Sequence, residues 1–112
     1  MQLQLPMLTV YEGPRLLPTS TVNLCTTYRQ AVALCHQLRT RTRMTNRQLA
    51  EECGCYASHL SDYLADDESK REMPAKMIPA FETSCGNRAI TQWLAGQAHL
   101  TILETFIQAK AA

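Results

Sequence analysis

The chain has 112 residues and a formal net charge of +1; 46% of its residues are hydrophobic and 19% are charged. This size and balance predict a single domain with a compact core and exclude global disorder. No apolar run is long enough to span a bilayer, and the first residues lack the basic and apolar segments of a signal peptide, so no membrane association and a cytoplasmic location are expected.

Residues 1–20 are expected to form an extended N-terminal arm. Three prolines and Gly13 are spread through this segment. Proline cannot donate to a sheet ladder, so the β-favouring residues at 8–11 predict at most a short edge strand. The sequence favours neither an arm folded across a partner subunit nor a free one.

A first core helix is predicted from Thr21 or Asn23 to about Leu38. Apolar residues recur there with helical spacing and make one continuous face. Arg29 is assigned to the polar side, away from that face. Residues 40–44 are then expected to form a loop.

Residues 45–64 predict two short helices joined by a tight turn. Thr45 is a good N-cap, and Gln48 is placed to complete a capping box with it. Gly54 ends the first helix where a left-handed backbone conformation is needed. Ser58 is expected to take over as cap and so to shorten the second helix, or else the ring of Tyr56 is expected to lie on the backbone. The inward residues are expected to be Leu49, Ala50, Cys53, Leu60, Tyr63 and Leu64.

Charge is distributed unevenly around these two helices. Arginines cluster before and within the first helix, whereas Asp66, Asp67 and Glu68 follow the second. A basic approach is what contact with nucleic-acid phosphates requires, although alternating arginines also occur in solvated turns. The four arginines are Arg39, Arg41, Arg43 and Arg47.

The remaining chain predicts a polar loop at 65–73, a turn at 74–76, and helices at 79–84 and 88–94. Asn87 is expected to cap the last of these, with Ile90, Trp93 and Leu94 inward and Gly96 interrupting it. Residues 96–112 carry apolar side chains at helical spacing, which suits either a dimer contact or docking onto the chain's own core.

The spacing of Leu49, Ala50, Gly54, Cys55 and Leu60 resembles the helix-turn-helix of phage and bacterial repressors. Residues 49–95, and IPAFETSCGNRAITQWLA within them, are similar to the lysogeny-control proteins of phages, a branch of the lambda-repressor-like DNA-binding domains. The resemblance implies an all-α bundle at 21–95 that binds double-stranded DNA. It further implies a homodimer on an inverted-repeat operator and a transcriptional regulator of the repressor kind, of phage or prophage origin. Tyr56 departs from the Ser or Thr usual in such families.

The resemblance also implies which side chains meet the DNA. Ala57, Ser58 and Asp62 would face the bases, where they can contact a thymine methyl, several base edges and cytosine N4, respectively. Contacts with the DNA backbone are expected from Arg41, Arg43, Asn46, Arg47, Gln48, Ser61, Lys70 and Arg71. Lys70 and Arg71 are equally well explained as solvated charges.

No catalytic constellation, cofactor motif or small-molecule substrate site is evident, so the chain is not expected to be an enzyme. The rival hypothesis is a zinc ion bound by Cys53, Cys55 and His59, or by Cys25, Cys35 and His36. The single residue between Cys53 and Cys55 is not the usual spacing of zinc ligands. The five cysteines are expected to be small buried hydrophobes in a reducing compartment. A protein-interaction adaptor, or an inhibitor of a host protein, is the alternative function.

Overall fold

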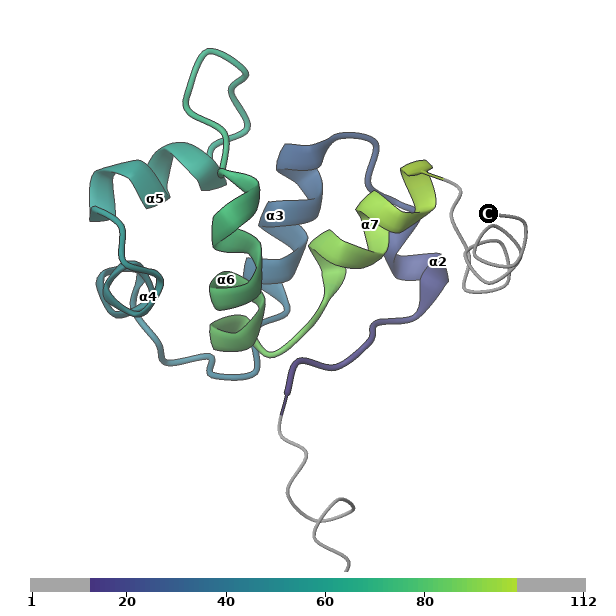
Figure 1. The fold of residues 1–112 in the computed structure, drawn as a ribbon, viewed down its shortest axis with the longest axis horizontal. Helices are drawn as coiled ribbons and strands as arrows, with labels where there is room; N and C mark the ends of the chain where they lie inside the picture. Colours follow the sequence, from purple (N-terminus) through teal and green to yellow (C-terminus); the bar gives the residue numbers. More distant parts are fainter. Residues whose placement is uncertain (1–12, 99–112) are drawn as a thin grey trace, which may run out of the picture.

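The computed structural model describes residues 13–98, and its regular elements are all helical (Figure 1). The predicted all-α bundle is therefore confirmed. Within residues 13–98 there is no strand, only an isolated bridge between Arg15 and Asn87. In chain order the elements are α2 (Thr19–Val22), α3 (Tyr28–Gln37), α4 (Asn46–Cys53), α5 (Ala57–Leu64), the 3₁₀ turn η1 (Ala75–Met77), α6 (Ile78–Cys85) and α7 (Ala89–Ala98).

The core is built around α6. Figure 1 shows α6 between α4 and α5 on one side and α3 and α7 on the other. Phe81 and Cys85 of α6 are fully buried and belong to one cluster with residues from all four of these helices. A continuous core of this kind makes the position of α4 and α5 depend on α6.

The prediction of a single helix from about residue 21 to Leu38 is wrong, because the helical structure is interrupted between Val22 and Tyr28. Thr27 adopts an extended conformation, and its side chain accepts a hydrogen bond from the backbone N–H of Gln30. Thr27 therefore begins a new helix, α3. Its hydroxyl gives a backbone N–H a local hydrogen-bond partner in place of the carbonyl that a continuous helix would supply. Leu24, expected on the inner face, is consequently 79% exposed.

The last described helix also differs from expectation. Gly96 does not interrupt it, since α7 continues to Ala98. Leu94, predicted to face inward, is exposed, and Trp93 is half-buried with its Nε1 donating to the carbonyl of Cys25 at 3.0 Å. The apolar pattern predicted for 99–112 and the arm at 1–12 lie outside the described residues.

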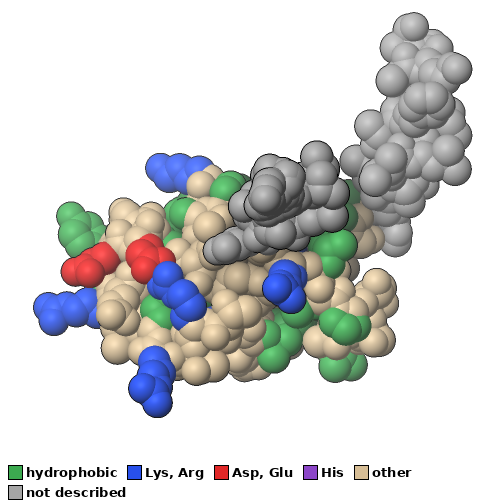
Figure 2. Space-filling model, turned by 90° about the horizontal axis from the view of Figure 1, so that it is seen from below, with side chains coloured by type: hydrophobic (Ala, Val, Ile, Leu, Met, Phe, Trp, Pro, Cys, Tyr) green, Lys and Arg blue, Asp and Glu red, His purple; other side chains and the backbone are tan. Residues whose placement is uncertain are grey.

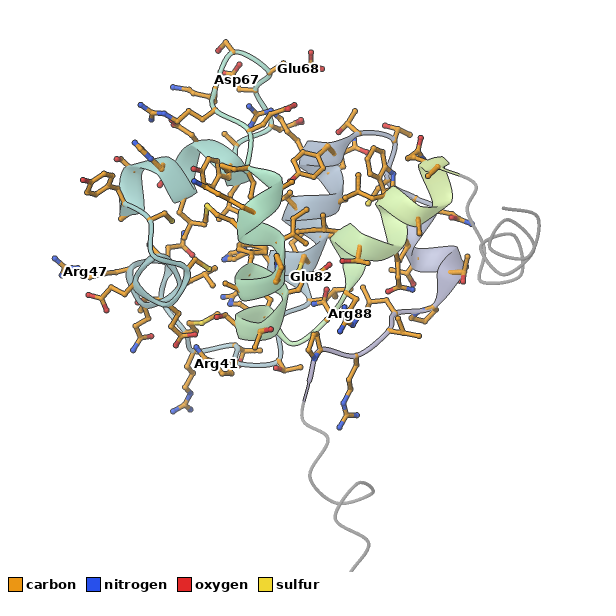
Figure 3. The ribbon with its side chains drawn as sticks, viewed as in Figure 1. Arg41, Arg47, Asp67, Glu68, Glu82 and Arg88 are labelled. Carbon is orange, nitrogen blue, oxygen red and sulfur yellow. The ribbon has the colours of Figure 1, made fainter. Side chains whose placement is uncertain are left out.

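The start of α7 is held by two buried polar side chains. Asn87 Oδ1 accepts from the N–H of Ala89, as predicted for a capping residue. Glu82, which is 1% exposed, accepts from both the N–H and the hydroxyl of Thr91, each at 2.7 Å. Figure 3 shows Glu82 near the middle of the molecule. Its carboxylate therefore ties α6 to the first turn of α7, where a negative charge also interacts favourably with the helix dipole.

Residues 13–18 run beside the start of α7. The N–H of Arg15 donates to the carbonyl of Gly86, and the N–H of Arg88 donates back to the carbonyl of Arg15. Leu17 exchanges two further hydrogen bonds of 2.9 Å with the side-chain amide of Gln92. The last part of the predicted arm is thus fixed to the bundle, and α2 begins at Thr19.

Candidate nucleic-acid interface

The start of α4 carries the capping box that the sequence predicts. The Thr45 hydroxyl accepts from the N–H of Gln48 at 3.1 Å, and the Gln48 side-chain oxygen accepts from the N–H of Thr45 at 2.9 Å. Two N–H groups that a helix start leaves without intrahelical partners are satisfied in this way. The capping box therefore fixes where α4 begins and how it leaves the preceding loop.

Gly54 forms the turn between α4 and α5 with φ of 74°, the left-handed conformation expected there. Its N–H bonds back to α4, and the N–H of Cys55 donates to the carbonyl of Ala50 at 3.0 Å. The reversal is therefore closed by backbone hydrogen bonds. Ala50 itself is 2% exposed, and its small side chain lets the two helices cross closely.

The second helix begins at Ala57, with Tyr56 in the N-cap position and no side-chain cap. The expected shift of the cap to Ser58 is therefore wrong. Tyr56 is 73% exposed, and its ring meets the ring of His59 edge to face, with the ring centres 5.1 Å apart.

The outer surface of α5 carries the small side chains predicted to face DNA. Ala57, Ser58 and Ser61 are all exposed, whereas Leu60 on the opposite face is fully buried. Figure 3 shows Arg47 projecting from α4 on the side of the molecule where α5 begins. The structure thus brings the start of α5 and Arg47 to one side of the two-helix unit.

Asp62, the third predicted base contact, is already paired. Its Oδ2 lies 2.8 Å from Nη1 of Arg71, and the Asp62 side chain is only 23% exposed. The Arg71 side chain was predicted to contact the DNA backbone. A side chain expected to bind a base and one expected to bind a phosphate are therefore paired with each other. An ion pair at this partly exposed position lowers the charge that either side chain offers to a ligand.

Three of the other predicted backbone contacts also have partners within the chain. Arg41 Nη2 lies 2.6 Å from Oε2 of Glu52, and this hydrogen bond holds the pKa of the Glu52 carboxyl below its usual value. Asn46 Oδ1 lies 3.0 Å from Nε2 of His36, and burial lowers the pKa of that imidazole. The Gln48 side-chain oxygen is used in the capping box, which leaves its amide N–H₂ for other contacts.

Arg43, Arg47 and Lys70 are exposed and form no ion pair with any residue from 13 to 98. Figure 2 shows Lys and Arg side chains separated by uncharged surface on the face that it views, with acidic side chains toward its left. Figure 3 places Asp67 and Glu68 at the tip of the loop that follows α5. The Lys and Arg side chains on the face shown in Figure 2 are therefore scattered and not gathered into one patch.

Arg29 is the residue that the sequence reasoning missed. It is 4% exposed, and its guanidinium donates to four backbone carbonyls, those of Asp62, Ala65, Lys70 and Arg71. These oxygens belong to the last turn of α5 and the loop beyond it, so one buried cation fixes both. The available signal was its i+3 relation to Val32, which lies on the predicted apolar face.

The thiols show no sign of a metal centre. All five cysteines are free, and the described part of the chain contains no cluster of three or more His, Cys, Asp or Glu side chains suited to a metal ion. Burial raises the pKa of the Cys53 thiol to about 12, and a hydrogen bond with Cys85 followed by burial holds the pKa of Cys35 far above its usual value. A raised pKa favours the thiol over the more nucleophilic thiolate at neutral pH.

Comparison with protein-family models, curated proteins and solved structures finds no match to this chain. None of the helices between residues 13 and 98 is long and apolar enough to cross a membrane. The function must therefore be argued from the geometry of α4 and α5.

Proposed function

We propose that this protein is a sequence-specific DNA-binding transcriptional regulator of the repressor kind, of phage or prophage origin. It binds an inverted-repeat operator as a homodimer in the cytoplasm, and α5 enters the major groove. The observation that carries the proposal is the exposed start of α5, where Ala57 and Ser58 stand on a helix held by the Gly54 turn. Small side chains such as these, on a fixed helix, can approach base edges closely.

The charges near α5 favour modest, local contact with phosphates. Arg43 and Arg47 are unpaired by any acidic side chain in the described chain, whereas Arg41 and Arg71 are neutralised by Glu52 and Asp62. Each arginine that binds a phosphate contributes a slope of about −0.9 to the dependence of log affinity on log salt. We therefore expect Arg43 and Arg47 to supply about two such contacts per subunit, which predicts a shallow salt dependence.

Selection of binding sites from a random duplex library, at low and at physiological salt, tests this proposal. We expect enrichment of an inverted repeat whose half-sites lie about one helical turn, 10–10.5 base pairs, apart. A Ser58→Ala variant should change the preferred sequence while keeping non-specific binding. Failure to enrich any sequence, with weak binding lost at physiological salt, would reject the proposal.

A protein-interaction adaptor is the second candidate, favoured by Tyr56. A large aromatic side chain that is 73% exposed beside the turn is typical of a residue that anchors a protein interface. The same selection separates the candidates, because an adaptor would bind its partner without a preferred DNA sequence and without a salt dependence set by phosphates.

A further inference from the structure

A half-open groove of about 370 Å³ runs along one side of α3. Leu24 and Cys25, from the segment between α2 and α3, line it together with Leu64 at the end of α5 and with Ala33 and Leu34 of α3. Small-molecule sites have volumes of this order and are mostly apolar, with a few polar groups that orient the ligand. These five residues supply the apolar part of such a site.

Two of the polar side chains that line the groove are already bonded within the chain. Arg29 donates to the four backbone carbonyls described above, and its Nε, which has no partner, is closed off from solvent. The Gln30 side-chain oxygen accepts from both the N–H and the hydroxyl of Thr26. Neither the guanidinium of Arg29 nor the side-chain oxygen of Gln30 is therefore available to a ligand.

Three other polar side chains of the lining form no hydrogen bond or ion pair with any residue from 13 to 98, and they are Thr21, Gln37 and Asp66. Asp66 follows Ala65, whose carbonyl is bound by Arg29 near the start of α3, whereas Gln37 ends α3. Both Asp66 and Gln37 are exposed. The groove therefore has a free carboxylate toward one end and a free amide toward the other.

Asp66 determines the charge of the ligand that the groove favours. Its carboxylate can accept charge-assisted hydrogen bonds from an ammonium group. Water screens such a pair less beside an apolar wall than on an open surface. An anionic ligand would instead meet the Asp66 carboxylate, while the donors of Arg29 that could bind it are already used.

We propose that this groove binds a small amphipathic amine, a molecule with an apolar chain or ring and one ammonium group. The ammonium group pairs with Asp66, and the apolar part covers Leu24, Leu34 and Leu64. The amide of Gln37 is left for a polar group at the far end of the ligand. A ligand bound in this way joins α3 to the end of α5. This inference concerns a ligand site, and it stands whether or not the protein binds DNA.

Octylammonium chloride is the probe for this site, at concentrations too low to form micelles. It would be titrated into the isotope-labelled full chain near neutral pH, and the NMR shifts of the backbone amides followed. We expect saturable shifts at Leu24, Leu34 and Ala65. Octanol and octanoate carry the same apolar chain with no charge and with a negative charge. Octanol should bind more weakly than octylammonium, and octanoate more weakly still, because Asp66 attracts the first charge and repels the second.

Two charge variants test the role of Asp66. Asp66→Asn should weaken the binding of octylammonium by roughly two- to fivefold, the effect of losing a partly exposed ion pair, and should leave octanol unaffected. Glu68→Gln removes the same charge from the same loop, at the tip seen in Figure 3, and should leave the binding of octylammonium unchanged. Leu24→Ser, at an exposed position, tests the apolar part and should weaken octylammonium and octanol by similar factors.

Three results would overturn the proposal. The first is binding of octanoate at these amides as tight as that of octylammonium. The second is an equal effect of Asp66→Asn and Glu68→Gln, which would mean that the amine senses only the overall charge of the loop. The third is the absence of saturable shifts at the groove, or shifts that spread to core residues such as Leu49 and Leu60, which would mean non-specific action of the amine only.

Discussion

Nη1 of Arg29 donates a hydrogen bond of 2.8 Å to the carbonyl oxygen of Asp62, thirty-three residues further along the chain. The last carbonyl groups of a helix lack the usual donor four residues on. The carbonyl of Asp62 accepts from the N–H of Ala65 at 3.3 Å, and a buried side chain from α3 supplies a second donor. The same guanidinium also holds Lys70 and Arg71 through their backbone oxygens. The positions of the side chains at the end of α5 and in the loop beyond it therefore depend on Arg29, which is itself buried.

Arg29→Met should lower the free energy of unfolding by about 2–4 kcal/mol, because four carbonyls lose a charged donor while the aliphatic volume is retained. Urea denaturation at neutral pH measures this change. Arg43→Met is the control, since Arg43 is exposed, and it should cost at most about 0.5 kcal/mol. Equal effects of the two substitutions would mean that the carbonyls find water as readily as they find Arg29.

The two left-handed glycines should respond differently to alanine. Gly54→Ala meets no atom within 4 Å, so its cost is the backbone conformation alone, about 1–2 kcal/mol. At Gly86, with φ of 86°, a new Cβ would lie 2.5 Å from the Thr40 hydroxyl, and overpacking adds about 1–3 kcal/mol.

A double-mutant cycle isolates the cost of the clash between the new Cβ at Gly86 and the Thr40 side chain. Thr40→Ala removes the hydroxyl and the methyl group nearest to the new Cβ, so it should recover part of the loss in Gly86→Ala. It should recover nothing in Gly54→Ala. Thermal or urea unfolding measures all of the variants, and a strictly additive cycle at Gly86 would rule out the clash.

Tyr28 should make stability depend on alkaline pH. Burial and then the charges of Glu72 and Glu82 raise its pKa to about 12, and its hydroxyl donates to the carbonyl of Met73 at 2.8 Å. Because the folded pKa lies above the unfolded value of about 10, the contribution of Tyr28 is complete below pH 10 and is lost as pH rises toward 12.

The comparison with Tyr28→Phe tests this sign. The difference in unfolding free energy between the two proteins should be about 1 kcal/mol at pH 7–9 and should shrink above pH 10. Urea midpoints at pH 8, 10 and 11 measure it. Tyr56→Phe, on an exposed ring, should leave stability unchanged at each pH. If the difference in unfolding free energy between the wild type and Tyr28→Phe grew with pH, the pKa of Tyr28 would be lowered by folding and not raised.

Arg47 and Arg41 should contribute unequally to DNA binding. Arg47→Ala removes an unpaired charge and should reduce the salt slope by about one, whereas Arg41→Ala removes a charge already paired with Glu52 and should have a smaller effect. Arg43→Ala should behave like Arg47→Ala. Titration of a labelled duplex at several salt concentrations measures these slopes, and an effect of Arg41→Ala as large as that of Arg47→Ala would show that its ion pair opens on DNA.

Asp62→Asn should strengthen binding to all DNA, because it removes a negative charge near the phosphates and frees Arg71 to contact one. The salt slope should increase by about one. Glu68→Gln changes the net charge equally, at the loop tip seen in Figure 3, and serves as the control. A fall in affinity for the selected site alone would instead identify Asp62 as a base contact.

The features that sequence predicted well are local ones. The partners that Thr45, Gly54 and Asn87 bind in their helix caps lie within a few residues along the chain, so residue type and spacing determine them. Helical periodicity was less reliable where a local cap competed with it, as at Thr27. A regular apolar pattern through that residue predicted one helix where the chain forms two.

The candidate site was harder to predict because its charges are paired across the fold. Glu52 lies eleven residues after Arg41, and Asp62 lies nine residues before Arg71, on separate elements in each case. Spacing within one helix cannot show such pairs. The burial of Arg29 was missed for the same reason, since its partners come from α5 and the loop beyond it.

The hydrogen bonds between Leu17 and Gln92 also bear on the order in which the chain folds. They join residues separated by 75 positions. During synthesis, at about 5–20 residues per second, residues 13–18 must wait several seconds before their partners leave the ribosome. Most contacts of α4, α5 and α6 span shorter stretches of sequence and can form in that interval. The first described segment to be made is therefore among the last to reach its final place.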